Sequence, residues 1–362
     1  MRKILLMLAG APLLVAGLIA MPHSIAVADT AEDTKIGSSA HIEADTGAEA
    51  SSDPAWLKFD RDWQKEIDQL AQTAQESQDA GFRDGDVFAD VDEAARQSSN
   101  PLGGDFMVML NQWNVDFLQG DITDKTRNSY VHVFQPVIPI GLGGDWIVVS
   151  RPTLPIVYDA EIPKGPNQFD NESGFGDIIL FSLLGTSTAT DFLGGGDRVL
   201  AGGFTSMFPT GSEEFTTDQY SLGPAGVAAF IGEEYIFGAL GQHWWDVAED
   251  KDNAPDVNQS NIQYFYFKNF PGGWQVGGAP QIEVDWEADS GDKWAVPVGL
   301  GIQGMHFFGK MPVRFGVEAQ YYVVNRNTLG NEWRIQFTIA PIIPNFIGNL
   351  IKGCPMMSIG GC

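Results

Sequence analysis

Between about residues 104 and 344, hydrophobic residues recur at every second position, which is the period of a β-strand. The alternation is clearest in four segments near the C-terminus, 274–286, 294–302, 313–323 and 333–340. One face of each segment is apolar, whereas the other carries mainly Gly, Ala, Gln and Thr with few charges. The pattern predicts long strands with one face against apolar material.

Two features indicate that this apolar material is lipid and not the core of a soluble sandwich. A sheet face in water usually carries many Lys and Glu residues, and the polar face here does not. Trp274 and Trp286 share the apolar face, and at ~3.3 Å per residue they are separated by ~40 Å of strand. At a tilt of ~40° this covers ~30 Å of membrane. We expect Trp274, Trp286, Trp294 and Trp333 to form the aromatic girdles of a transmembrane barrel.

The predicted fold is all-β, an antiparallel up-and-down barrel of about twelve strands with an N-terminal periplasmic helical segment. The expected strands are roughly 105–119, 128–140, 145–158, 175–186, 197–209, 218–231, 234–247, 258–270, 273–287, 293–307, 312–325 and 331–344. Short turns at 232–233, 271–273 and 309–310 alternate with longer acidic loops at 160–173, 211–217, 248–256 and 288–292. This alternation puts both termini on the periplasmic side.

The two ends of the chain have different patterns. Basic residues at 2–3, an apolar run and a small-residue site predict a secretory signal peptide over 1–28, and therefore export to the bacterial outer membrane. Apolar residues three and four positions apart predict an amphipathic helix over 54–80. The other expected segments are an acidic disordered linker over 29–53, a linker over 81–99, the barrel over 100–346 and a C-terminal tail over 347–362.

Composition narrows the function. A net charge of −26 argues against a nucleic-acid partner. With 2 Cys and 5 His and no catalytic motif, we expect no enzyme, no cofactor and no metal site. A G-x-G-x-x-G sequence over 299–304 lies inside a predicted strand, without the helix that dinucleotide binding requires. Cys354 and Cys362 in the tail form a local disulfide or remain two free thiols.

The polar face of the strands would line the lumen and set its selectivity. The predicted pore-lining residues are Gln275, Gln281, Glu283, Asp285, Gln303, Arg314, Glu318, Gln320, Arg334 and Gln336, together with Arg151. Arginines facing carboxylates form either a transverse field, as in a porin constriction, or a salt-bridge network that fills the lumen. Because eight strands fill their own interior and 16–18 leave a water channel, about twelve predict a narrow or plugged pore.

Several short sequences resemble the landmarks of a known family. They are Asn-Pro-Leu-Gly at 100–103, Gln-Pro-Val-Ile-Pro at 135–139, Gly-Phe-Gly-Asp-Ile at 174–178, Ser-Leu-Gly-Pro at 221–224, Asp-Trp-Glu-Ala-Asp-Ser-Gly-Asp-Lys-Trp at 285–294 and the Tyr-Tyr pair at 321–322. Over about residues 100–344 the chain resembles the bacterial outer-membrane transporter-like family grouped with the meta-pathway phenol-degradation proteins. The resemblance implies an outer-membrane barrel and passage of small or aromatic compounds.

Two functions remain open from the sequence. The first is an outer-membrane channel or transporter-like barrel, surrounded by outer-membrane lipid, that passes small solutes, including aromatic or hydrophobic ones. The second is a structural or interaction barrel with a closed lumen, in which the helix over 54–80 docks a periplasmic partner or a second copy of the chain.

A pair of adjacent substitutions tests which face meets lipid. Phe337 lies on the predicted lipid face and Gln336 on the predicted lumen face. Phe337→Arg is expected to lower the free energy of unfolding by ~2–4 kcal/mol near the bilayer midplane, whereas Gln336→Arg is expected to be tolerated. Denaturant unfolding in lipid vesicles measures both, and equal effects would contradict the assigned faces.

Overall fold

The structure is a computed structural model that describes Lys65, residues 90–103 and residues 106–352. The predicted signal peptide over 1–28, the linker over 29–53, Cys354 and Cys362 lie outside the described residues. So does the helix predicted over 54–80, apart from Lys65.

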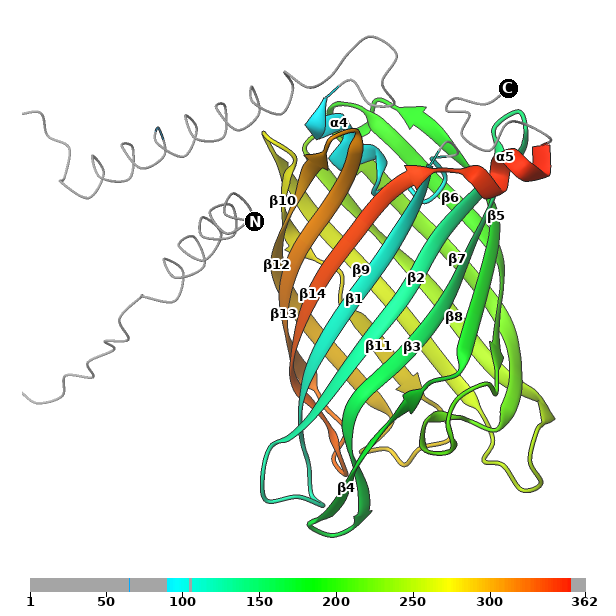
Figure 1. The fold of residues 1–362 in the computed structure, drawn as a ribbon, viewed down its shortest axis with the longest axis vertical. Helices are drawn as coiled ribbons and strands as arrows, with labels where there is room; N and C mark the ends of the chain where they lie inside the picture. Colours follow the sequence, from blue (N-terminus) through cyan, green and yellow to red (C-terminus); the bar gives the residue numbers. More distant parts are fainter. Residues whose placement is uncertain (1–64, 66–89, 104–105, 353–362) are drawn as a thin grey trace, which may run out of the picture. The chain divides into compact units, whose positions relative to one another are not determined.

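Twelve strand positions close into an antiparallel β-barrel, as the alternation predicts (Figure 1). The first strand, β1 (Phe106–Gln119), pairs with the last, β14 (Gly330–Pro344), and closes the sheet. The strands between them are β2 (Arg127–Gly143), β3 (Trp146–Gly165), β4 (Gln168–Phe175), β5 (Ile178–Thr190), β6 (Gly196–Phe208), β7 (Gln219–Gly232), β8 (Tyr235–Glu249), β9 (Asn258–Phe270), β10 (Trp274–Gly278), β11 (Gln281–Asp285), β12 (Trp294–Phe308) and β13 (Met311–Val324). β4 pairs only with β3, and β10 and β11 share one position between β9 and β12.

Adjacent residues of the C-terminal strands alternate between the exterior and the interior of the barrel. Phe337 on β14 is 47% exposed, whereas its neighbour Gln336 is 7% exposed. On β13, Val317 lies opposite Phe337 and Glu318 lies opposite Gln336. Apolar residues of the two strands therefore share one face of the sheet, and polar residues share the other. The apolar set faces outward, as hydrocarbon around the barrel requires.

One end of the barrel carries short turns and the other carries longer loops, and we call them the short-turn end and the long-loop end. The short turns are at 144–145, 233–234, 271–273 and 309–310, with the 3₁₀ turn η1 (Phe192–Gly194) between β5 and β6. The longer connections are at 120–126, 209–218, 250–257, 286–293 and 325–329. The second of them contains the 3₁₀ turn η2 (Glu213–Phe215).

The expected loop over 160–173 is wrong. The end of β3 pairs with β4, with Glu161 opposite Asn171, so a β-hairpin continues from the barrel at the long-loop end. Asn167 turns this hairpin with a φ of 57°, a conformation that Asn adopts more readily than most residues. Arg127 of the neighbouring β2 supports the hairpin through an ion pair with Glu161 at 3.1 Å.

The expected single strand over 273–287 is interrupted. β10 ends at Gly278, β11 begins at Gln281, and Ala279 and Pro280 lie outside the ladder. Pro280 has no N–H to donate and a fixed φ, so it stops regular pairing inside a spanning strand. β12 therefore pairs with β10 only over 301–304 and with β11 only at 294–295.

Two tyrosines from β9 cover this interruption from the outer face of the barrel. The Tyr264 hydroxyl donates to the Pro297 carbonyl at 2.7 Å, and the Tyr266 hydroxyl donates to the Gly299 carbonyl. Both carbonyls belong to the stretch of β12 that lacks a ladder partner in β10 or β11. Because an unpaired backbone group in a bilayer costs several kcal/mol, the hydroxyls replace missing ladder bonds.

A carboxylate covers the same interruption from the interior. Glu318 on β13 accepts from the Ala279 N–H at 3.0 Å and from the Gln320 side chain at 3.0 Å. A Cβ at Gly299 would lie 2.3 Å from the Glu318 carboxylate, so only glycine allows this close approach. The wall is thus completed by side chains where the backbone ladder stops.

The linker expected over 81–99 is wrong in part, because residues 91–97 form the helix α4. Asp90 caps it and accepts from the Glu93 N–H at 2.7 Å. A helix of 7 residues is too short to show a period in the sequence, and its stability comes from tertiary packing. A second helix, α5 (Phe346–Lys352), follows β14. No helix among the described residues is long and apolar enough to cross a membrane.

Removing a single tyrosine hydroxyl tests how the wall is completed. Tyr264→Phe and Tyr266→Phe are each expected to lower the free energy of unfolding by about 1 kcal/mol or more, because a β12 carbonyl loses its donor. Tyr321→Phe is the matched control, since this ring is 40% exposed and its hydroxyl makes no hydrogen bond among the described residues. Denaturant unfolding in vesicles compares the three variants, and equal losses would contradict the assignment.

Candidate functional site: the lumen and its closed mouth

The lumen has two chemically different walls. Strands β3 and β5–β8 present aliphatic and aromatic side chains to the interior. The facing strands β9–β14, with β1 and β2, present many amide side chains there. The first wall suits an apolar surface, and the second offers both donors and acceptors.

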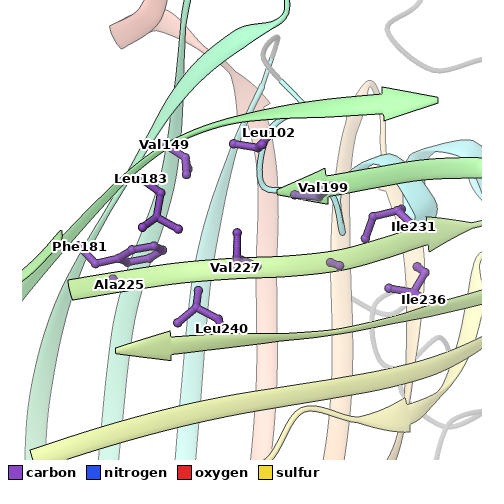
Figure 2. Packing of buried hydrophobic residues seen from close by; sticks show 11 residues of the cluster. Leu102, Val149, Phe181, Leu183, Val199, Ala225, Val227, Ile231, Ile236 and Leu240 are labelled. Carbon is purple, nitrogen blue, oxygen red and sulfur yellow. The ribbon is translucent and has the colours of Figure 1, made fainter. Parts of the chain in front are cut away.

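The apolar wall is a buried cluster that lies toward the short-turn end (Figure 2). Phe181 and Leu183 of β5 and Val227 of β7 point into the same space. The cluster consists of Leu102, Val149, Phe181, Leu183, Val199, Ala225, Val227, Ala229, Ile231, Ile236 and Leu240. All of these side chains are less than 10% exposed, so this part of the lumen is packed. Arg151, predicted to line the pore, lies beside this wall on β3.

The amide wall contains a continuous series of hydrogen bonds across β2, β1 and β14. Gln135 donates to Gln112 at 3.3 Å, Gln112 donates to Gln336 at 3.1 Å, and Gln336 donates to Asn114 at 2.9 Å. The four side chains are 6–8% exposed. Each amide therefore finds partners in its neighbours within a buried environment.

Because Gln336 belongs to this series, Gln336→Arg is not a neutral control for Phe337→Arg. Gln336→Arg would remove two of these hydrogen bonds, so it would carry a cost of its own. Thr338 lies two positions further along the same face and borders a lumen cavity. Thr338→Arg is the better lumen control for Phe337→Arg.

Predicted pore-lining residues of β10–β12 also lie on the lumen face. Gln303 donates to Gln275 at 2.6 Å, and Gln275 donates to Asn269 at 2.8 Å. Gln281 accepts from Asn261 at 3.0 Å. These bonds link β12, β10 and β9 as the other series links β14, β1 and β2.

Some of the charged lumen residues form local pairs. Arg334 donates to both carboxylate oxygens of Asp116, at 2.5 Å and 3.1 Å, and the two residues lie directly opposite each other on adjacent strands. Glu283 pairs with Arg326 at 3.4 Å, and Asp285 accepts from a backbone N–H of the following loop. This arrangement favours the salt-bridge interpretation over separated charges that face each other across the lumen.

The segment 90–103 lies against the interior of the barrel at the short-turn end, and we call it the mouth segment (Figure 1). Its helix α4 lies against β12 and β7. Ala94 packs in a buried cluster with Met305 of β12 and Ile342 of β14. At the other end of the segment, Leu102 joins the apolar wall. The mouth segment thus closes this end of the lumen.

Arg314 of β13 fastens the mouth segment. Its guanidinium donates to the Ala95 carbonyl at 3.1 Å, to the Ser99 hydroxyl at 3.0 Å and to the Ser98 hydroxyl. Arg314 was predicted to line the pore, and the structure places it on the lumen face with its guanidinium engaged by the mouth segment.

Two further contacts fix the segment at other points of the wall. Asn100 donates to the Ser187 hydroxyl of β5 at 2.9 Å. Asp92 accepts from the Gly273 N–H at 2.5 Å in the turn between β9 and β10. Gly273 has a φ of 74°, and a Cβ there would lie 2.8 Å from an α4 side chain, so glycine is required for this approach. The segment is therefore held from several sides.

Two cavities lie in and beside the lumen. One, of about 130 Å³, borders the amide wall. It is lined in part by Gln112, Gln263, Gln303, Arg314 and Glu318. The other, of about 430 Å³, lies beside α4 and is lined by five carboxylates, those of Asp90, Asp92, Glu93, Glu233 and Glu234, among other residues.

The four predicted girdle tryptophans are all partly exposed, at 39–44%. Trp274 begins β10 near the short-turn end, whereas Trp294 begins β12 and Trp333 lies in β14 near the long-loop end. Trp286 lies between β11 and β12, where its ring contacts that of Trp294 with centroids 5.7 Å apart. They therefore mark both ends of the barrel.

Hydrogen bonds join neighbouring loops at the long-loop end. Thr328 donates its N–H and its hydroxyl to Asp292, at 2.7 Å and 2.6 Å. These hydrogen bonds, the hydroxyl's first, hold the pKa of Asp292 below its usual range. No group of three or more His, Cys, Asp or Glu residues in the described part of the chain is placed to hold a metal ion.

Several lumen residues were missed by the sequence analysis. Gln112, Asn114 and Asp116 alternate with the apolar residues of 113–117, the same signal that identified the C-terminal strands. The partners of Arg314 in the mouth segment had no such signal, because they lie more than 210 positions away in the chain.

The role of Arg314 can be tested by hydrogen exchange. Arg314→Gln is expected to speed amide exchange in residues 91–99 by about tenfold or more, because hydrogen bonds to a charged group are lost. Arg326→Gln is the matched control, since its partner Glu283 is in β11 and not in the mouth segment. Exchange followed by mass spectrometry compares the two, and unchanged exchange in Arg314→Gln would contradict the anchoring role.

Comparison with known proteins agrees with the fold. No family model and no curated protein match this chain. An outer membrane channel from Pseudomonas putida F1, seen in a crystal structure, is similar with a TM-score of 0.50 and 12% identity, over 66% of this chain and 96% of that one. A BenF-like porin from Pseudomonas fluorescens Pf-5 matches with a TM-score of 0.23 and 8% identity, over 67% of this chain and 98% of that one. The first likeness shows that this chain has the fold of an outer-membrane β-barrel.

Proposed function

We propose that the protein is an outer-membrane channel or transporter-like barrel that passes small solutes with apolar surface, and that the structure is its closed state. The apolar exterior and the girdle tryptophans support insertion in a membrane. The signal peptide expected over 1–28 supports export to the outer membrane.

The apolar wall is the observation that carries this proposal. Interior positions of a barrel that conducts water and ions are polar. Here Leu183, Val227 and Leu240 are turned into the lumen, opposite the amide wall. Such a lumen gives an aromatic or aliphatic solute an apolar surface on one side and hydrogen-bonding groups on the other.

Passage requires the mouth segment to move. Among the described residues, its polar contacts to the wall include those of Arg314, Asn100 and Asp92. Hydrogen bonds of this kind can be exchanged for bonds to water when the segment leaves, because each adds only about 1 kcal/mol net, or ~1.5–3 kcal/mol where one group is charged. We therefore interpret the mouth segment as a removable closure.

Two deletions test the proposal. Deletion of 29–99 removes α4 and is expected to raise the flux of small solutes into proteoliposomes well above that of the full mature chain. Deletion of 29–89 leaves the mouth segment in place, so its flux is expected to match that of the full chain. Liposome swelling with small neutral solutes measures the flux, and equal flux from both deletions would contradict the closure.

A closed structural barrel is the second candidate, and the buried apolar cluster and amide series in the lumen favour it. In that case the helix expected over 54–80 docks a periplasmic partner or another copy, and no deletion opens the barrel. A folded 29–99 deletion that passes no solute would support this second function.

A further inference from the structure

Arg151 is a lumen arginine without an acidic partner. It lies on β3 directly opposite Phe181 of β5, and Phe181 is a member of the apolar wall. Its guanidinium stacks on the Phe181 ring at 4.5 Å from the centroid. The Arg151 Nε is buried and has no hydrogen-bond partner among the described residues, and no carboxylate of these residues forms an ion pair with the side chain.

The other arginines on the lumen face are engaged differently. Arg334 donates hydrogen bonds to both carboxylate oxygens of Asp116. Arg314 donates hydrogen bonds to a carbonyl and two hydroxyls of the mouth segment. A cation that is partly removed from water without a counter-charge is costly. In a chain of net charge −26, an arginine that keeps no carboxylate partner in a packed lumen is conspicuous.

The surroundings of Arg151 are apolar on one side and polar on the other. One step toward the short-turn end, Val149 lies opposite Leu183, and both belong to the apolar wall. Beyond Phe181 on the next strand, Thr205 donates to Gln242 at 3.1 Å. Leu102 of the mouth segment covers part of this wall. When the segment is displaced, a ligand at Arg151 would have its charged group at the guanidinium and its apolar body against the wall.

We propose that Arg151 binds the carboxylate of small amphipathic solutes whose apolar part lies on the wall formed around Phe181 and Leu183. This inference rests on the proposed channel function and names its substrate class. The planar guanidinium offers paired N–H donors that match the two oxygens of a carboxylate. A solute anion supplies the counter-charge that the described residues do not.

Octanoate and octanamide are suitable probes, because they share one chain and differ in headgroup charge. Wild-type protein in phosphatidylcholine nanodiscs is expected to bind octanoate about tenfold or more tightly than octanamide, measured as the ratio of their Kd values by calorimetry. Acetate, which has the headgroup without the chain, is expected to bind about tenfold or more weakly than octanoate.

Substitution of Arg151 separates a recognition role from a structural one. Arg151→Gln is expected to abolish the preference for octanoate, so that the Kd values of octanoate and octanamide become equal. Arg151→Lys keeps the charge and is expected to retain part of the preference. Arg198→Gln removes the same charge from an exposed position of β6 and is the matched control, in which the preference is expected to remain.

The outcomes distinguish this inference from the channel function. If both probes bind equally to the wild-type protein, or if Arg151→Gln keeps the preference, Arg151 is not a carboxylate site. Suppose that one of these two results is found, and that octanamide still crosses proteoliposomes containing the protein with the 29–99 deletion. The channel function then stands, and only the inference about Arg151 is overturned. If neither probe binds or crosses, both are overturned.

Discussion

The requirement that every backbone polar group inside a bilayer finds a partner determines this structure. Closure of β1 on β14 satisfies it along most of the wall. Where Pro280 stops the ladder, the requirement still holds, and Tyr264, Tyr266 and Glu318 supply the hydrogen bonds that the strands do not. Side chains at this position are therefore part of the wall itself.

The same requirement acts inside the barrel, where many of the polar side chains are buried. Polar side chains must then satisfy one another, as in the amide series around Gln336 and the pair of Arg334 with Asp116. Apolar side chains of the opposite wall need no partners and pack together. The mouth segment contributes to both kinds of contact, through Arg314 and through Leu102.

The strands could be predicted from the sequence wherever the two faces of the sheet meet chemically different surroundings. β13 and β14 separate lipid from polar lumen groups, so they alternate clearly. β3 alternates poorly because much of the lumen beside it is apolar, so both of its faces carry similar residues. The break at Pro280 was not predicted, because the alternation of apolar and polar residues continues across it. The mouth segment could not be foreseen, because its few contacts join residues far apart in the chain.

The mouth segment precedes β1 by only two residues, 104–105, and this covalent attachment has a thermodynamic consequence. For the removable closure proposed above, this attachment means that the displaced segment returns to its contacts as an intramolecular partner, at an effective concentration in the millimolar range for a short linker. Contacts too weak to hold two separate molecules together then suffice to keep the mouth segment bound in the barrel most of the time. Brief release and rapid return need no external factor, whereas a lasting open state would need something that captures the displaced segment.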